Sequence, residues 1–94
     1  MVFGNNPATR EFLVVLARRL FGERAFARRA LLVKAETEFR IAGLWADRED
    51  APTPSERRAD RPRSRGFVML DYAFSELSRA GRLSHIAHGV WRLA

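Results

Sequence analysis

The chain has 94 residues, 47% of them hydrophobic, and no cysteine, so we expect one small domain without disulfides or thiolate metal sites. Its 17 basic residues exceed its 11 acidic residues to give a formal net charge of +6, and every basic residue except Lys34 is an arginine. This imbalance favours a polyanionic partner. No apolar stretch approaches the length of a membrane span and no secretory signal pattern opens the chain, so we expect a cytoplasmic protein.

The first half of the chain predicts two helices. Asn6 and Pro7 suit the N-cap and the first position of a helix, apolar residues follow at helical spacing, and Gly22 is a typical terminator. These signals predict a helix over about 8–21. A second periodic segment predicts another helix over about 28–42.

Residues 47–66 differ from the segments around them, because they carry several prolines, many charges and no apolar period. We expect a flexible loop here, within a single domain that spans residues 1–94, since neither flank has enough apolar residues to form a core alone.

The last part of the chain predicts a helix followed by a hairpin. Apolar residues return at helical spacing over about 68–80, and Gly81 follows as a stop. In 83–94, β-forming residues flank a turn near 87–89. The order helix, helix, loop, helix, hairpin predicts a mainly α fold with a small β-hairpin, namely a winged helix-turn-helix of three helices and a C-terminal β wing.

The C-terminal third also carries a sequence pattern: a Tyr-Ala helix start, a Leu, a Gly that ends the helix, and a closing Gly-Val-aromatic-Arg strand. Its stretches are Arg65-Gly66-Phe67-Val68, Leu70-Asp71-Tyr72-Ala73-Phe74-Ser75-Glu76-Leu77, Ala80-Gly81-Arg82-Leu83 and Gly89-Val90-Trp91-Arg92-Leu93. This pattern resembles the N-terminal winged-helix domain of Mrr-type restriction proteins over about 64–94, more loosely over the first two helices, and not in the loop. The resemblance implies the DNA-recognition module of a modification-dependent restriction system, with double-stranded DNA, in some members modified DNA, as the partner.

The nuclease signature of such systems is absent from the chain. It requires an acidic residue and, later, an acid-x-Lys pair that hold a metal and activate water. Lys34 is the only lysine, and Leu32 lies two positions before it. We therefore expect a non-catalytic domain with no cofactor, no metal ion and no small-molecule substrate.

The candidate DNA contacts lie on and around the helix predicted over 68–80. Its outer face, opposite the apolar stripe, is expected to carry Val68, Asp71, Tyr72, Ser75, Ser78 and Arg79. Arginine and serine are suited to base edges, tyrosine to stacking, and arginines near the helix and hairpin to phosphates. The predicted DNA-binding residues are Arg61, Arg63, Arg65, Tyr72, Ser75, Arg79, Arg82, His85 and His88.

Two acidic residues on that helix keep other hypotheses open. Asp71 and Glu76 would repel phosphate, which favours a protein-interaction or dimerisation winged helix, with a homodimer as one outcome. A transcription regulator is a third hypothesis, because fold alone does not decide function. For each charged candidate, an ordinary solvated surface is the alternative.

Overall fold

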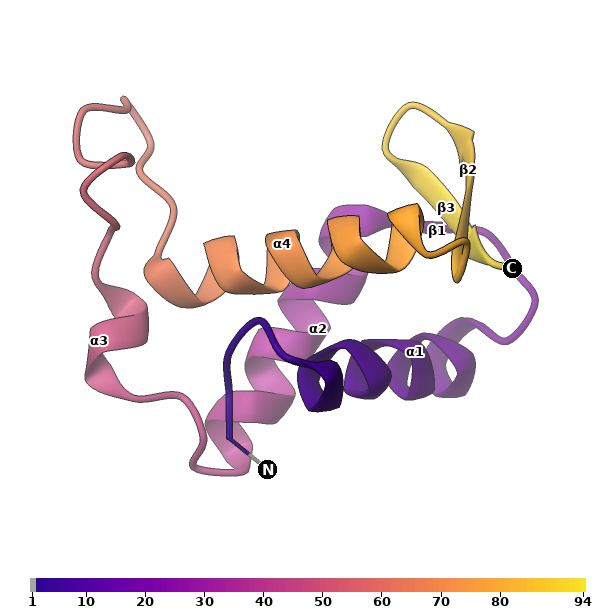
Figure 1. Cartoon of the computed structure of the whole chain (residues 1–94), viewed down its shortest axis with the longest axis horizontal. Coiled ribbons are helices and arrows are strands. Elements are labelled where there is room, and N and C mark those ends of the chain that lie inside the picture. Colours follow the sequence, from indigo (N-terminus) through magenta and orange to yellow (C-terminus); the bar gives the residue numbers. More distant parts are fainter. Residues whose placement is uncertain (1) are drawn as a thin grey trace.

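The structure, a computed structural model, describes residues 2–94, which contain four helices and a three-stranded antiparallel sheet (Figure 1). The mainly helical fold with a C-terminal hairpin is therefore confirmed. No helix in this part of the chain is long and apolar enough to cross a membrane. The elements are α1 (Pro7–Phe21), β1 (Phe26–Ala27), α2 (Arg28–Ile41), α3 (Asp47–Asp50), α4 (Arg65–Arg79), β2 (Leu83–Ala87) and β3 (Val90–Leu93).

Side-chain caps decide where two of the long helices begin. The Asn6 side chain accepts a hydrogen bond from the Thr9 backbone N–H at 2.9 Å, at the start of α1. The Ser64 hydroxyl accepts one from the Phe67 backbone N–H at 3.2 Å, at the start of α4. Caps of this kind stabilise a helix by about 1 kcal/mol. Because Ser64 is the cap, α4 begins at Arg65, earlier than the predicted start at 68.

The segment predicted as a loop over 47–66 is only partly a loop. Its first four residues form α3, its last two belong to α4, and Pro52 pairs with Ser64 in an isolated β-bridge. Glu49 in α3 is only 4% exposed, and its carboxylate accepts a hydrogen bond from the Ala46 backbone N–H at 3.0 Å. This local cap stabilises a short charged helix, which the sequence did not predict because the segment has no apolar period.

The sheet contains a strand that the sequence did not predict. Its order is β1-β3-β2, with Phe26 of β1 opposite Trp91 of β3. β1 has two residues, which is too short for an alternating pattern to appear. The turn of the hairpin lies at His88 and Gly89, and Gly89 has a φ of 71°, which favours glycine.

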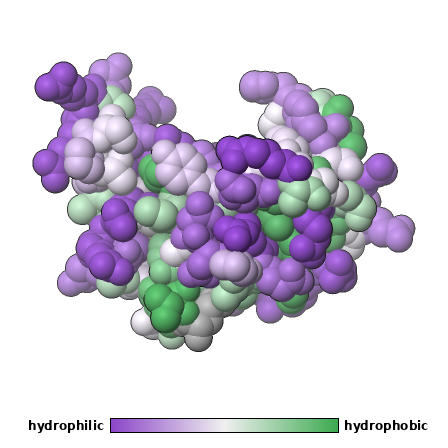
Figure 2. All heavy atoms as spheres, in the orientation of Figure 1, coloured by the Kyte–Doolittle hydropathy of each residue, from purple (hydrophilic) through white to green (hydrophobic). Residues whose placement is uncertain are grey.

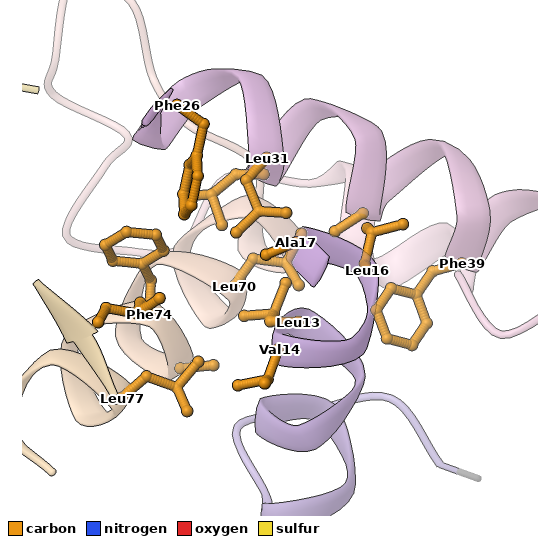
Figure 3. Close-up of a cluster of buried hydrophobic side chains, with 14 of the residues drawn as sticks. Leu13, Val14, Leu16, Ala17, Phe26, Leu31, Phe39, Leu70, Phe74 and Leu77 are labelled. Carbon is orange, nitrogen blue, oxygen red and sulfur yellow. The ribbon is translucent and has the colours of Figure 1, made fainter. Parts of the chain in front are cut away.

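The core lies where α1, α2 and α4 meet (Figure 3). Leu13, Leu16, Leu31, Leu70 and Phe74 are each at most 2% exposed. Burying a side chain of this size contributes about 1.5–3 kcal/mol. One face of α4 therefore packs into the core, and its opposite face is directed towards solvent.

The Trp45 side chain packs against the N-terminal end of α4. A Cβ atom placed on Gly66 would lie 2.2 Å from the Trp45 ring, so only glycine allows this close approach. The indole also donates a hydrogen bond to Asp50 at 3.1 Å and packs against Phe3, with 5.1 Å between ring centroids. The guanidinium of Arg40 lies 4.9 Å from the ring centroid of Trp45.

Candidate nucleic-acid interface

The outward face of α4 lies between two projecting segments. The connection between α3 and α4, residues 51–64, rises at one end of the helix, and the β2–β3 hairpin rises at the other (Figure 1). In the space-filling view the surface is hollowed between these projections, and hydrophilic residues dominate the rim (Figure 2). The outer stripe of α4 consists of the exposed Arg65, Tyr72 and Arg79 and the half-buried Met69 and Glu76, which recur at intervals of four and three residues.

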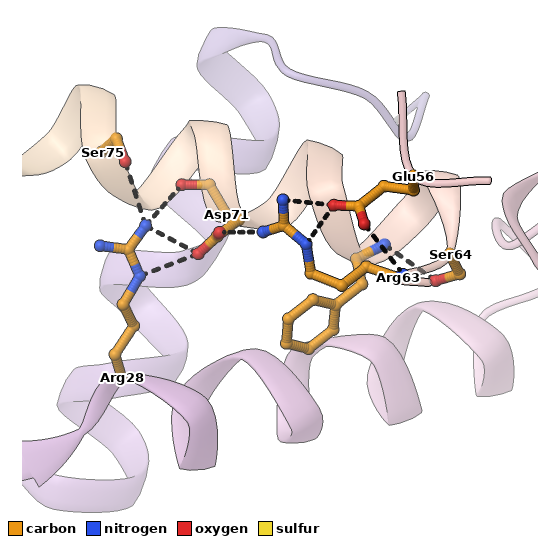
Figure 4. A network of polar contacts seen from close by, with 7 residues as sticks. Arg28, Glu56, Arg63, Ser64, Asp71 and Ser75 are labelled. Atoms are coloured by element: carbon orange, nitrogen blue, oxygen red, sulfur yellow. Dashed lines mark hydrogen bonds and ion pairs between the residues drawn. The ribbon is translucent and has the colours of Figure 1, made fainter. Parts of the chain in front are cut away.

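Beside this stripe, Arg28 at the start of α2 joins α4. Its Nε donates to the Asp71 carboxylate at 2.9 Å, and its Nη2 donates to the Ser75 hydroxyl at 3.0 Å (Figure 4). The same guanidinium lies 4.4 Å from the ring centroid of Phe74. Both charged side chains are about a quarter exposed, so this contact is largely shielded from water. Ser75 is therefore engaged within the protein, although the sequence predicted it as a free DNA contact.

Arg63 lies between two carboxylates. Its Nε donates to Glu56 at 2.6 Å and its Nη1 donates to Asp71 at 2.7 Å. The hydrogen bond to Glu56, with further attraction from Asp71, raises the pKa of the Arg63 guanidinium above its ordinary value. Asp71 therefore receives two arginines, one from α2 and one from the segment 51–64 (Figure 4).

Three other predicted arginines also have carboxylate partners. Arg65 Nε lies 3.8 Å from Glu49, Arg79 pairs with Glu76 one turn earlier in α4, and Arg82 Nη2 lies 3.2 Å from Glu11 of α1. The Arg79 side chain is 70% exposed, and pairs this open to water contribute at most about 1 kcal/mol. The contact with Glu76 is therefore only a weak restraint on the Arg79 guanidinium.

Some basic residues within 2–94 have no carboxylate within salt-bridge distance. Three of them lie in the segment 51–64 beside the N-terminal end of α4, and Arg29 borders the same region from α2. Arg29, Arg61 and Arg63 line a shallow depression of about 420 Å³ there. The whole set is Arg10, Arg18, Arg24, Arg29, Lys34, Arg57, Arg58, Arg61 and Arg92.

The hairpin presents its two histidines to solvent. His88 is exposed at the turn, and His85 is exposed on β2 with its ring centroid 4.6 Å from that of Trp91. Trp91 in turn packs edge-on against Phe74 of α4, at 5.0 Å between centroids. This stack fixes the hairpin against the helix. No group of three or more His, Cys, Asp or Glu residues that could hold a metal ion occurs in residues 2–94.

The predicted contact residues therefore form two groups. One, Arg61, Arg63 and Arg65, lies at the N-terminal end of α4; the other, with Arg79, Arg82 and the hairpin histidines, lies at its C-terminal end. A rise of 1.5 Å per residue separates the two ends of the helix by about 20 Å. Tyr72 lies between them and is 56% exposed.

One sequence-based assignment on α4 needs correction, and the sequence did not predict the roles of two residues outside this helix. Val68, expected on the outer face, is 5% exposed, because the apolar surface of α4 is wider than one regular stripe. The roles of Arg28 and Glu56 were missed. Arg28 and Asp71 are 43 residues apart in the sequence, and no local spacing signals a contact over that distance.

Comparisons of this chain with protein-family models, with curated proteins and with solved structures find no match.

Proposed function

We propose that the chain is a winged-helix domain that binds double-stranded DNA along the exposed face of α4, with the segment 51–64 and the β2–β3 hairpin on either side. The observation that carries the proposal is the hydrophilic hollow over α4, with basic groups at both of its ends (Figure 2). The order of the elements also supports the proposal. β1 lies between α1 and α2 in the chain and pairs with β3, so that it adds a third strand to the C-terminal hairpin.

The geometry suits a helix in a groove flanked by phosphates. The major groove of B-DNA is about 12 Å wide and admits one α-helix. In this arrangement Tyr72 and Arg79 face base edges. Arg57, Arg58 and Arg61 reach one phosphate backbone, and the hairpin reaches the other.

The experiment is a fluorescence-anisotropy titration of the protein with a generic 20-base-pair duplex over a range of salt concentrations. If about five phosphates are neutralised, log K falls with log salt with a slope of about −4 to −5. A flat salt response, or no binding at low salt, contradicts the proposal. A single strand of the same length serves as the comparison ligand, and the proposal predicts that the duplex binds more tightly.

The resemblance to Mrr-type restriction proteins adds a narrower hypothesis, in which the domain is the non-catalytic recognition module of a restriction system. Its support is the sequence pattern in residues 64–94. Competition between an unmodified duplex and a cytosine-methylated duplex of the same sequence tests it. A preference for the methylated duplex supports this hypothesis, and equal competition contradicts a modification-dependent role.

A second candidate function is protein docking. It is favoured by a surface that lies away from the α4 stripe. A groove of about 610 Å³ between α1 and α2 has mainly apolar lining residues, including Leu20, Phe21 and Val33. Its polar lining residues, Arg29 and Lys34, have no carboxylate partner within the described chain. This combination fits an amphipathic helix with acidic flanks.

A synthetic amphipathic helix that carries leucines on one face and glutamates beside them tests the docking surface. Binding of this peptide that Val33→Glu abolishes supports docking. Equal binding of a matched peptide with lysines in place of the glutamates, or no binding of either peptide, contradicts it.

A further inference from the structure

We propose that Glu56 competes with the nucleic acid for Arg63, so that a phosphate of the duplex must displace the Glu56 carboxylate before Arg63 can bind it. This inference rests on the proposed function and specifies how the same site is controlled. It starts from an apparent conflict: Arg63 is well placed beside α4 for a phosphate, yet its donors are already used inside the protein.

The contacts of Arg63 leave little room for a phosphate. A guanidinium recognises a phosphate through two parallel N–H donors, which is the geometry it also offers a carboxylate. One such edge of Arg63 faces a single Glu56 oxygen, Oε1, through Nε at 2.6 Å and Nη2 at 2.5 Å. Another donor, Nη1, faces Asp71 at 2.7 Å. A phosphate can therefore gain a two-donor contact only by replacing one of these carboxylates.

The two carboxylates differ in what they lose when Arg63 leaves. Asp71 keeps Arg28, which binds it from α2 at 2.7 Å. The side-chain hydrogen bonds and ion pairs of Glu56 within residues 2–94 are all with Arg63, including one from the Arg63 backbone N–H at 3.5 Å. Glu56 is also on the segment 51–64, whereas Asp71 is fixed within α4. Glu56 is therefore the group that a phosphate displaces.

Because Glu56 must be displaced, only a ligand with several closely spaced negative charges is expected to bind Arg63. The Glu56 side chain is 14% exposed, so its attraction for Arg63 is less weakened by water than that of a fully solvated pair. An isolated anion gains too little by replacing it. A duplex also contacts the neighbouring unpaired arginines Arg57, Arg58 and Arg61, and these contacts offset the displacement. Glu56 thus selects for an extended polyanion.

The test compares Glu56→Gln with Glu38→Gln in duplex-binding titrations over a range of salt concentrations. Both substitutions raise the net charge by one, and both release an arginine, because Glu38 pairs with Arg19 at 2.7 Å in a contact between α1 and α2. We expect Glu56→Gln to bind about fivefold more tightly at moderate salt, as for other charge pairs at an interface. Its slope of log K against log salt should stay close to that of the wild type, because Arg63 neutralises the same phosphate in both complexes. Glu38→Gln should change the affinity much less.

Arg63→Gln keeps the test decisive if Glu56→Gln alters folding. This variant should bind more weakly than the wild type with a shallower salt slope, and the gain from Glu56→Gln should vanish in the double variant. Equal affinities for Glu56→Gln and Glu38→Gln overturn the competition while leaving the binding of the wild type, and so the proposed function, intact. If neither the wild type nor Glu56→Gln binds duplex, the proposed function fails and the competition fails with it.

Discussion

The two ends of α4 differ in how their basic residues are balanced. At the N-terminal end, Arg63 and Arg65 face Glu56, Asp71 and Glu49, and the neighbouring segment 51–64 is tied to the helix through these contacts. At the C-terminal end, no acidic residue occurs from position 77 to position 94. Arg79 pairs with a carboxylate of α4 itself and Arg82 with one of α1, whereas Arg92 has no carboxylate partner within residues 2–94.

This difference shows that arginines of the same type are not equally available to a ligand. Arg63 has two short contacts and is 46% exposed, whereas Arg79 has one exposed partner and is 70% exposed. Exposed pairs are weak because water and salt screen them. We therefore expect a polyanion to engage Arg79 more readily than Arg63, whose donors become available only when Glu56 is displaced.

The largest expected effect is on the free energy of unfolding, through the packing of Trp45 against the N-terminal end of α4. Gly66→Ala places a Cβ atom 2.2 Å from the Trp45 ring, so the indole or the start of α4 must move. We expect a loss of about 3 kcal/mol in the free energy of unfolding, at the upper end of overpacking effects, measured by urea denaturation. In the Trp45→Leu background the cost should be much smaller. An equal cost in both backgrounds would place the strain elsewhere.

The availability of the C-terminal end is tested by Arg79→Ala. If Arg79 contacts a base, this change weakens duplex binding by about 2 kcal/mol in an anisotropy titration. The control is Arg18→Ala, which removes the same charge from α1, outside the proposed interface. Equal losses in the two variants would mean that net charge alone governs binding and that the end of α4 has no special role.

The link between α2 and α4 is tested by Arg28→Met, which removes the guanidinium from the Phe74 ring and from Asp71 and so leaves the Asp71–Arg63 pair without its second arginine. We expect a loss of about 1–2 kcal/mol in the free energy of unfolding, below the cost for a fully buried pair because both side chains are partly exposed. Arg19→Met, which breaks the more exposed pair with Glu38, should cost less than about 0.5 kcal/mol. If the two costs are equal, the Arg28 contact is no stronger than a surface pair.

The smallest effect is a pH dependence at the N-terminal end. The hydrogen bonds from Arg40 and Trp45 lower the pKa of Asp50 below the ordinary value of an aspartate carboxyl group. A carboxyl group whose pKa is lowered by folding stabilises the protein above its unfolded pKa and loses that contribution as the pH falls through the folded pKa. The stability difference between the wild type and Asp50→Asn should therefore be constant from pH 7 to about pH 5 and shrink towards pH 2. A difference that does not change with pH would exclude this ion pair as its source.

Much of the helical framework could be predicted from local sequence. The apolar spacing in 8–21 and the Asn6-Pro7 start correspond to α1, and the turn near 87–89 corresponds to the hairpin turn. β1 was missed because two residues carry no period. The start of α4 was placed too late because the prediction began at the apolar repeat and left the Ser64 cap in the loop.

The candidate site was less predictable than the fold. The sequence placed arginines near the last helix, but it could not show which of them are engaged by carboxylates. Glu56 and Arg63 are seven residues apart, within a segment that has no regular spacing from which to infer a contact. Arg28 reaches Asp71 only because α2 packs across α4.

The sequence by itself determined the three long helices, the hairpin and the excess of positive charge, because each depends on neighbouring residues or on composition. Only the tertiary structure decided which charges are neutralised and which face solvent. Ion pairs such as Arg28–Asp71 form between segments that the core brings together, and their strength depends on distance and on exclusion of water, neither of which local sequence specifies.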